Sequence, residues 1–432
     1  MRRWALLLGL VAPVVVACAP ASPEPEPSAG MRFGVLAASC TPERAAALRA
    51  AGVTVVELPL AWDRYQPVAD EADPDYVADL RVRRDACRDA GLDVVLSPGL
   101  QYPPAWVRAL PGGTLRGSSG GVPDGADLVF SSAVRDAVDD YLGRLAADLG
   151  FDGVTAVRVG TTATGELGFP GPVAAGNPDE YWAFGPAPQL GVGLAAGLEP
   201  GPLPGWVPGS SRWRGTEVTA DQADAWWTWY AGSAAAAVLA QVDRLRELGF
   251  TGEVHVPVAG RGALPADRAA AVAGLLDGRA DPDGALERGL DYPAQFAALA
   301  GAGVVVDFTG LDDVSAVRAR EAGLDRCLPG DEHDLTARAD VADWPPQRFT
   351  AAAARAAGLA LVGENPGPPD APFTGGSDDS DTLADQLRWA PSYAADCGLT
   401  TFLFAFEDDL FDGTSGVDVD DYAARIAAAG RG

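Results

Sequence analysis

From Met31 onward the chain repeats one pattern, a short apolar run followed by an amphipathic stretch rich in alanine, arginine and aspartate. Near-continuous apolar runs are expected for strands of a parallel sheet that is covered on both faces. Eight such runs occur, at residues 33–38, 53–60, 92–98, 154–160, 253–259, 303–309, 359–365 and 400–406.

The stretches between the runs are expected to be helices, and several end in a glycine that stops the helix just before the next strand. Eight strands alternating with helices predict a single-domain α/β fold, a (β/α)8 TIM barrel over residues 31–432. An open doubly wound sheet is the alternative, although residues 37–42 lack its glycine-rich phosphate turn. The expected helices cover residues 42–51, 74–90, 131–148, 221–248, 263–277 and 381–396.

The connections that follow the strands are long, whereas those that lead back into strands are short. The longest covers residues 161–220, follows the fourth strand and is rich in glycine, proline and tryptophan. Active sites of such barrels lie at the C-terminal ends of the strands, and a loop of this length usually forms part of a binding site. We therefore expect the functional site at this end of the barrel.

The chain is strongly acidic, with 32 lysines and arginines against 60 aspartates and glutamates and a formal charge of −28. This charge repels phosphate backbones, which argues against a nucleic-acid partner and against direct binding to anionic lipids. The only histidines are His255 and His333, and no metal-ligand spacing is present. The sequence therefore implies neither a metal nor any other cofactor.

The N-terminus resembles a bacterial lipoprotein signal. Arg2 and Arg3 precede an apolar run that ends at residue 17, and the following Cys18 occupies the position that carries lipid in such proteins. Residues 1–17 are thus expected to be a signal peptide, and residues 18–30 an extended, proline-rich tether. The protein would be exported and anchored by lipid to the outer face of the cell membrane, at the cell surface or in the periplasm. An ordinary secretory signal, or a cytosolic start at Met31, are the alternatives.

The four remaining cysteines are an even number, which permits two disulfides in an oxidising compartment. They allow three pairings, and four buried thiols are an alternative of similar weight. These cysteines are Cys40, Cys87, Cys327 and Cys397.

Two glutamates follow strands that should meet at the barrel mouth. Glu166 lies in GELGFP (165–170) after the fourth strand, and Glu364 in GENPG (363–367) after the seventh. Glycoside hydrolysis uses such a pair, in which one carboxylic acid protonates the leaving oxygen and the other carboxylate attacks the anomeric carbon or activates water. A solvated loop position for Glu166 and a turn role for Glu364 are the alternatives.

Several segments resemble known glycosidases. Residues 52–67 (GVTVVELPLAWDRYQP) and 92–107 (LDVVLSPGLQYPPAWV) are similar to family 42 β-galactosidases, and GELGFP is similar to the β-amylase segment that carries the general acid. The sequence resemblance covers strands 1 to 4. For strands 5 to 8 only the order of the elements is similar. It implies membership of the (β/α)8 clan with its acid/base on strand 4 and its nucleophile on strand 7, so that Glu166 is the acid and Glu364 the nucleophile or base.

One position departs from the retaining members of that clan. They have an asparagine directly before the acid/base glutamate, where it holds the sugar 2-hydroxyl, and Gly165 stands there in this chain. β-Amylases invert the anomeric centre and family 42 enzymes retain it. The outcome depends on the separation of the two carboxyl groups, so the sequence leaves it open.

Further residues at the same ends of the strands are candidates for binding sugar, because aromatic rings stack on sugar faces and polar groups bind hydroxyls. Asp307 and Glu57 are candidates for binding sugar hydroxyls, and a structural hydrogen bond inside the barrel is an equal alternative for each. Arg158 is expected either to orient a carboxylate or to fill the barrel interior. Glu407 is a rival for the second carboxylate, or part of a cation site with Asp408, Asp409 and Asp412. The predicted substrate-binding set is Trp62, Gln101, Tyr102, Trp106, Trp182, Trp206, Asp307, Asn365 and Glu407.

The sequence therefore predicts a glycoside hydrolase that cleaves an extracytoplasmic, β-linked oligo- or polysaccharide and needs no cofactor. A lipoprotein that binds glycans without cutting them is the main alternative. A two-lobed solute receptor is a third, and it would require two sheets joined by a hinge.

Overall fold

The structure is a computed structural model that describes residues 30–171, 174, 176, 179–279, 284–333, 335–336, 338–369 and 381–429. The predicted signal peptide, Cys18 and the tether as far as residue 29 lie outside the described residues. Within the described part of the chain, no helix has the length and apolar character needed to cross a membrane.

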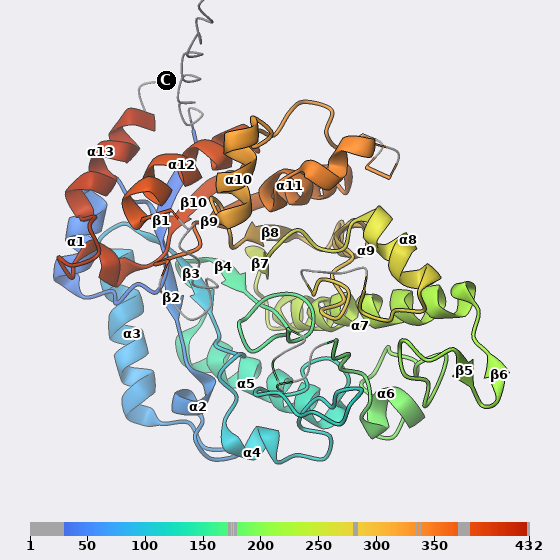
Figure 1. Cartoon of the computed structure of the whole chain (residues 1–432). Helices are drawn as coiled ribbons and strands as arrows, with labels where there is room; N and C mark the ends of the chain where they lie inside the picture. The colour runs from blue at the N-terminus through green and yellow to red at the C-terminus, as the bar shows by residue number, and fades with distance from the viewer. Residues whose placement is uncertain are drawn as a thin grey trace, which may run out of the picture.

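The described chain folds into a (β/α)8 barrel (Figure 1). Eight parallel strands close on themselves in the order β1-β10-β9-β8-β7-β4-β3-β2. This confirms the predicted fold and contradicts both the open sheet and the two-lobed receptor. Each strand falls within a predicted apolar run, apart from the first residue of β1: β1 (Arg32–Val35), β2 (Val55–Pro59), β3 (Asp93–Ser97), β4 (Val154–Arg158), β7 (Glu253–Val258), β8 (Val304–Phe308), β9 (Ala360–Glu364) and β10 (Thr401–Phe404).

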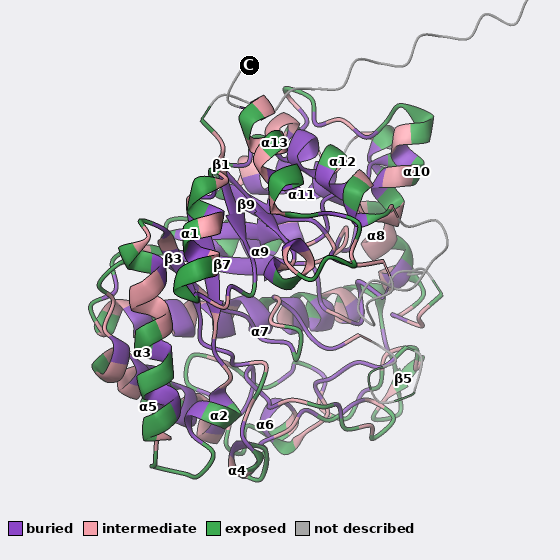
Figure 2. Cartoon of the chain, turned by 90° about the vertical axis from the view of Figure 1, so that its left-hand side faces the viewer, coloured by how far each residue is buried: buried purple, intermediate pink, exposed green. Residues whose placement is uncertain are grey.

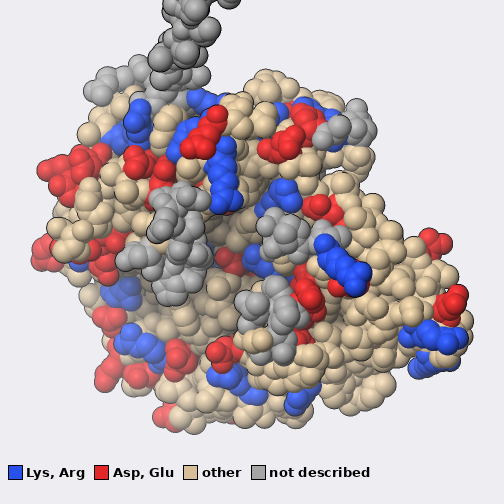
Figure 3. Space-filling model, in the orientation of Figure 1, with Lys and Arg blue, Asp and Glu red and all other residues tan. Residues whose placement is uncertain are grey.

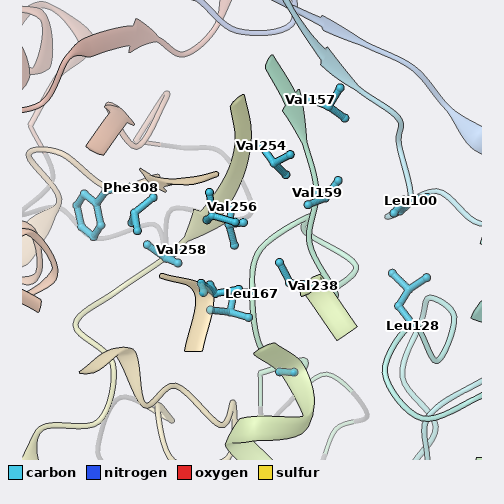
Figure 4. Packing of buried hydrophobic residues seen from close by; sticks show 14 of the residues in the cluster. Leu100, Leu128, Val157, Val159, Leu167, Val238, Val254, Val256, Val258 and Phe308 are labelled. Carbon is cyan, nitrogen blue, oxygen red and sulfur yellow. The ribbon is translucent and has the colours of Figure 1, made fainter. Parts of the chain in front are cut away.

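Both faces of the strands are buried, which explains their nearly continuous apolar sequence. Figure 2 shows the barrel strands as buried and the outer faces of many surrounding helices as exposed. In β7 the outward valines Val254, Val256 and Val258 belong to one cluster with Val238 of the long helix that packs beside them (Figure 4). Side chains alternate along a strand, so the residues between these valines face the barrel interior.

Helices surround the barrel and begin where the sequence supplies a cap. Asp73 accepts hydrogen bonds from the amides that open α3, and Thr219 with Gln222 forms a capping box at the start of α7. The predicted helices are confirmed to within a few residues. They are α1 (Pro42–Ala50), α3 (Pro74–Asp89), α5 (Ser132–Leu149), α7 (Ala220–Glu247), α8 (Pro265–Ala273) and α12 (Leu383–Asp396).

Further elements were not predicted, because most are short segments inside connections where the helical period is hard to see. A two-stranded hairpin and α6 lie in the long connection after β4. The additional elements are α2 (Trp62–Tyr65), α4 (Ala105–Arg108), α6 (Pro186–Leu190), β5 (Arg212–Trp213), β6 (Thr216–Glu217), α9 (Tyr292–Leu299), α10 (Val314–Ala322), α11 (Pro346–Ala356), α13 (Val419–Ala429) and 3-10 turns at Ala339–Asp343 and Glu407–Leu410.

The barrel interior changes character along its axis. A small apolar cluster that includes Val55, Val95 and Ala156 is separate from the main core between strands and helices. Two residues further along β2 and β4, on the same face, come Glu57 and Arg158. The lower barrel is therefore packed with apolar side chains, and its C-terminal end is charged.

Both pairs of cysteines form disulfides. Cys40, after β1, is bonded to Cys87 in α3, with their Cα atoms 5.2 Å apart. Cys327, after α10, is bonded to Cys397 at the end of α12, with a Cα separation of 5.0 Å. Of the three possible pairings, the structure selects the one that ties each loop to a nearby helix.

The Cys40–Cys87 disulfide closes a segment of 47 residues. Replacing both cysteines with alanine should lower the free energy of unfolding by about 4 kcal/mol, because the unfolded chain regains the entropy of the open loop. Urea unfolding measured beside the wild-type protein checks this value. Equal stabilities of the two proteins would contradict the bond, and a reductant should affect the variant less than the wild type.

Candidate active site

A polar pocket lies at the C-terminal ends of β2, β3 and β4, on the side of the barrel where the sequence places the site. One face of the molecule is hollowed near its centre, with acidic and basic side chains around the hollow (Figure 3). The side chains and backbone that line the pocket are those of Glu57, Ser97, Leu100, Gln101, Arg158, Val159, Gly160, Thr162, Thr164, Gly165 and Pro257.

Arg158 joins three strands across the barrel. It ends β4, and its Nε lies 3.0 Å from Oδ2 of Asp307 in β8. Its Nη2 donates a hydrogen bond of 2.9 Å to Oε2 of Glu364, the last residue of β9. Burial alone would lower the pKa of Arg158, but Asp307, Glu364 and Glu57 more than offset it and hold the pKa above its ordinary value. Arg158 is therefore a permanent cation inside the barrel.

Glu364 is buried, with its side chain 10% exposed. Burial raises the pKa of this carboxyl group to about 8. Arg158 acts in the opposite direction, while the negative charges of Asp307 and Glu57 add to the increase. In the unliganded protein, burial therefore favours the protonated form of Glu364 more than it is favoured in a free side chain.

Glu57 points into the pocket from β2. Its Oε2 accepts a hydrogen bond of 2.7 Å from the backbone amide of Ala37, and the residue is 5% exposed. Because Glu57 lines the pocket directly, it is positioned to contact a ligand as well as to hold the loop after β1. This placement is compatible with both roles that the sequence left open for Glu57, binding of a sugar hydroxyl and a structural hydrogen bond.

Glu166 is held by a tight turn that follows β4. The amides of Thr161 and Thr162 both donate to the Glu166 carbonyl, at 2.9 and 3.1 Å. Gly160 is required in this turn, since a Cβ atom there would lie 2.0 Å from the Gly165 carbonyl oxygen. The Glu166 side chain is 15% exposed.

The Glu166 carboxylate is surrounded by donors. Its Oε2 accepts hydrogen bonds from the hydroxyl groups of Thr164 and, at 3.4 Å, Thr162. Arg288, from the connection after α8, places its Nη2 3.8 Å from the same oxygen. Two hydroxyl groups and one guanidinium group thus face the same oxygen of Glu166.

The two predicted glutamates each contact residues that line the pocket. Arg158, which contacts Glu364, lines it together with Thr162 and Thr164, which contact Glu166. Neither glutamate lines the pocket itself, and each contacts side chains that do.

Comparisons with known proteins bear on the fold. The sequence matches no family model and no curated protein. Among solved structures, the catalytic domain of the β-amylase of Paenibacillus polymyxa is similar, with a TM-score of 0.58 and 13% identity over 93% of this chain and 98% of that one.

Two β-galactosidases are also similar. The β-galactosidase of the psychrophilic Marinomonas ef1 has a TM-score of 0.55 and 14% identity over 92% of this chain. The β-galactosidase of the haloarchaeon Halorubrum lacusprofundi has a TM-score of 0.52 and 15% identity, also over 92% of this chain. The match spans 59% and 57% of those two longer chains. The chain has the (β/α)8 barrel fold of these glycosidases.

Glu407 does not reach the pocket of this barrel. It is fully buried, and its Oε2 accepts from Nη1 of Arg44 and from the amide of Ser39, each at 2.9 Å. The prediction that Glu407 binds substrate, or acts as the second carboxylate, is therefore wrong, because the side chain holds the loop after β1. Asp408 also pairs with Arg44, and no group of three acidic, histidine or cysteine side chains able to hold a metal occurs among the described residues.

Asn365 and Asp307 also have structural partners. Asn365 is 1% exposed and donates to Oε1 of Gln386 at 2.9 Å, while it accepts from the amide of Ala405 at 2.9 Å. Asp307 is fully buried against Arg158. Neither side chain has exposed surface, so the prediction that Asn365 and Asp307 bind substrate directly is wrong. Both residues instead support the site through their contacts within the protein.

Three predicted stacking platforms lie in the core. Trp62, Trp182 and Trp206 are 0%, 0% and 1% exposed, and each indole nitrogen donates to a protein oxygen. Trp62 stacks on Tyr141 with ring centroids 4.8 Å apart. A ring covered on all sides offers no face to a sugar, so the prediction that these tryptophans bind substrate is wrong.

The remaining predicted residues lie nearer the opening. Gln101 lines the pocket, and Tyr102 beside it is 51% exposed. Trp106 is partly buried and donates to the carbonyl of Gln66 at 3.0 Å. Gln101 and Tyr102 therefore remain candidates for ligand contact, whereas the indole nitrogen of Trp106 is already bonded within the protein.

Sequence reasoning missed the groups that hold Glu166. Thr162 and Thr164 stand four and two residues before it, and hydroxyl groups so close to a predicted catalytic carboxylate could have been noticed. Arg288 gave no signal, because it is 122 positions further along the chain. For Arg158 the sequence left two roles open, orienting a carboxylate and filling the barrel interior, and the structure shows both.

The buried proton of Glu364 makes stability depend on pH. Between the ordinary pKa of 4.5 and about 8, the unfolded chain has ionised Glu364 while the folded chain keeps the proton. The folded state then binds more protons, so this group's contribution to stability should fall as pH rises through that window.

The variant Glu364→Gln lacks this titration. Relative to the wild type it should become more stable as pH rises from about 4.5 to about 8, which urea unfolding at several pH values measures. Glu407→Gln, which removes a buried charge paired with Arg44, should be destabilised instead and serves as the matched control. A stability difference between Glu364→Gln and wild type that does not vary with pH would contradict the buried proton.

Proposed function

We propose that this barrel is a glycoside hydrolase that cleaves O-glycosidic bonds with Glu166 and Glu364. The observation that supports the proposal is a polar pocket at the C-terminal end of the barrel whose lining residues include Arg158, which binds Glu364, and Thr162 and Thr164, which bind Glu166. Hydrolysis of a glycosidic bond needs one group that gives a proton and a second that is negatively charged. The raised pKa of Glu364, caused first by burial, is consistent with a pair in which one carboxyl group can carry a proton.

The charge balance of the pocket favours the same chemistry. The transition state of glycoside hydrolysis carries positive charge on the sugar ring. Glu57, Asp307 and Glu364 face a single Arg158 inside the barrel, so negative charge is in excess once Glu364 ionises. Preorganised charge of this sign would stabilise the transition state more than the neutral substrate.

The substrate we propose is a β-linked oligo- or polysaccharide outside the cytoplasm. The similar solved structures are a β-amylase domain and β-galactosidases, and likeness at this level of identity supports the fold more than the sugar. The exposed ring of Tyr102 beside Gln101 would serve a sugar unit beyond the reacting one, since aromatic rings stack on apolar sugar faces.

Glu166→Gln tests the hydrolase proposal, because it keeps the shape of the side chain and removes its charge. Hydrolysis of chromogenic glycosides should fall by roughly 10²–10⁴-fold, with carbohydrate binding retained. Glu217→Gln is the matched control: it makes the same change at an exposed residue of the same long connection and should leave the rate unchanged. Equal rates for Glu166→Gln and the control would rule out the catalytic assignment.

The second candidate function is a surface lipoprotein that binds glycans without cutting them. Gly165, in place of the asparagine that retaining enzymes of this clan use to hold the 2-hydroxyl, favours it. A binder would show saturable glycan binding but no hydrolysis in the wild type, which separates the two functions in the same assay.

We place the protein outside the cytoplasm, anchored by lipid on Cys18. The lipoprotein-like N-terminus supports this location, and so do two disulfides, which persist in oxidising compartments.

Cys18→Ser should abolish the anchor, because the thiol that would carry the lipid is gone. Fractionation of cells that express the full chain should find the wild type with membranes and the variant in the soluble extracytoplasmic fraction or the medium. Membrane association that is the same in both would contradict the anchor.

A further inference from the structure

The loop after β1, residues 36–41, holds Glu57 at the wall of the pocket. The backbone amide of Ala37 donates a hydrogen bond of 2.7 Å to Oε2 of Glu57, and the amide of Ala38 donates one of 2.8 Å to the Glu57 carbonyl. Among the described residues, Ala37 is the one hydrogen-bond donor to the Glu57 carboxyl group. The direction in which this carboxyl group points therefore depends on where the loop lies.

The loop has a backbone conformation that its own residues do not favour. Ala37 and Cys40 have φ angles of 55° and 52°, in the left-handed region where a Cβ atom comes too close to a carbonyl oxygen. Residues keep such a conformation only where the surrounding structure enforces it. The position of the Ala37 amide is thus set by the groups that are packed around the loop.

Helix α3 holds the loop from one side. Arg83 donates from Nε to the Ser39 carbonyl at 2.9 Å and from Nη2 to the Ala38 carbonyl at 3.0 Å. Cys87, four residues further along α3 and so on the same face of the helix, forms the disulfide with Cys40. Both cysteines are buried, so this bond fixes the end of the loop inside the protein.

The segment after β10 holds the loop from the other side. The fully buried Glu407 accepts from the Ser39 amide and from Nη1 of Arg44, each at 2.9 Å, and its own amide donates to the Leu36 carbonyl at 3.0 Å. No residue of the loop is among those that line the pocket. The loop therefore reaches the pocket through Glu57, which does line it.

We propose that this loop positions Glu57 for contact with the substrate, and that Glu407, Arg83 and the Cys40–Cys87 disulfide act on the pocket through the loop. The inference rests on the proposed function, in which a glycan occupies the pocket. Glu407, Arg83 and the disulfide are positioning groups, since none of them lines the pocket. Glu57 itself would accept hydrogen bonds from sugar hydroxyl groups, which requires a carboxyl group with a fixed direction.

Removal of each disulfide in turn tests the proposal. Replacing Cys40 and Cys87 with alanine should lower kcat/KM on a 4-nitrophenyl glycoside by roughly 10–10²-fold, because a contact displaced by about 1 Å can cost that much. The matched control replaces Cys327 and Cys397, whose disulfide joins segments that do not line the pocket, and should leave kcat/KM unchanged. Equal activities of the two double variants would contradict the proposal.

Arg83→Ala loosens the same loop without breaking a disulfide, and it should lower kcat/KM in the same direction. Its control is Arg81→Ala on the same helix, which removes contacts with Asp148 and leaves the loop intact. The control should keep the wild-type rate. A rate for Arg83→Ala that equals the rate of Arg81→Ala would count against the loop.

A double-mutant cycle separates positioning of Glu57 from a general loosening of the protein. Glu57→Ala removes the carboxyl group through which the loop is proposed to act. In that background, removal of the Cys40–Cys87 disulfide should cause little further loss of kcat/KM, because both changes disable the same contact. Losses that multiply would show that the disulfide affects the site by another route, and would overturn the proposal.

Hydrogen exchange of the unliganded protein provides a readout that does not depend on activity. The amides of Ala37, Ala38 and Ser39 all donate within the protein, so they should exchange slowly in the wild type and in the Cys327 and Cys397 control. They should exchange faster when Cys40 and Cys87 are replaced.

The exchange pattern and the activity distinguish the two ways in which the account could fail. Unchanged exchange in the variant without the Cys40–Cys87 disulfide would refute the role of the loop, whether or not the protein is a hydrolase. Wild-type protein that cuts no glycoside, but shows the expected exchange pattern, would refute the hydrolase and support the hold of the loop on Glu57.

Discussion

Arg158 is the cation that allows three carboxyl groups to lie inside one barrel. Its guanidinium pairs with Asp307 at 3.0 Å and Glu364 at 2.9 Å, and these side chains come from three different strands. Without it Asp307, Glu364 and Glu57 would face one another as like charges, and breaking a buried pair of this kind typically costs about 3–5 kcal/mol. Burial, together with the charges of Asp307 and Glu57, still raises the pKa of Glu364 despite its contact with this cation. The contacts of Arg158 therefore both hold three strands together and affect the acidity of Glu364.

The other half of the site depends on the long connection after β4, which is a folded extension with its own core. Phe169 stacks on Tyr230 of α7 with ring centroids 4.1 Å apart, and the hydroxyl group of Tyr230 accepts from the amide of Trp182. These contacts fix the chain on the C-terminal side of Glu166, while the turn from Gly160 fixes it on the other. A catalytic carboxylate needs such support, because small displacements reduce the rate strongly.

Much of the barrel could be predicted from the sequence, because its strands are buried on both faces and its helices have clear caps. The positions of Glu166 and Glu364 could be predicted for a related reason: parallel strands bring their C-terminal ends together. The predictions for Trp62, Trp182, Trp206, Asn365 and Glu407 were wrong, since sequence position does not tell whether a side chain in a loop faces the pocket or the core. The cysteine pairing and the contacts of Arg288 depend on distant segments, which no local pattern reveals.

The most direct test of the paired carboxyl groups is a crystal structure of the protein with a disaccharide whose glycosidic oxygen is replaced by sulfur, so that it binds without being cut. The account predicts that the sulfur lies in the pocket bounded by Glu57, Arg158 and Thr164, with the carboxyl groups of Glu166 and Glu364 on either side of the bond. A ligand seated elsewhere, or one approached by only one of these carboxyl groups, would contradict it.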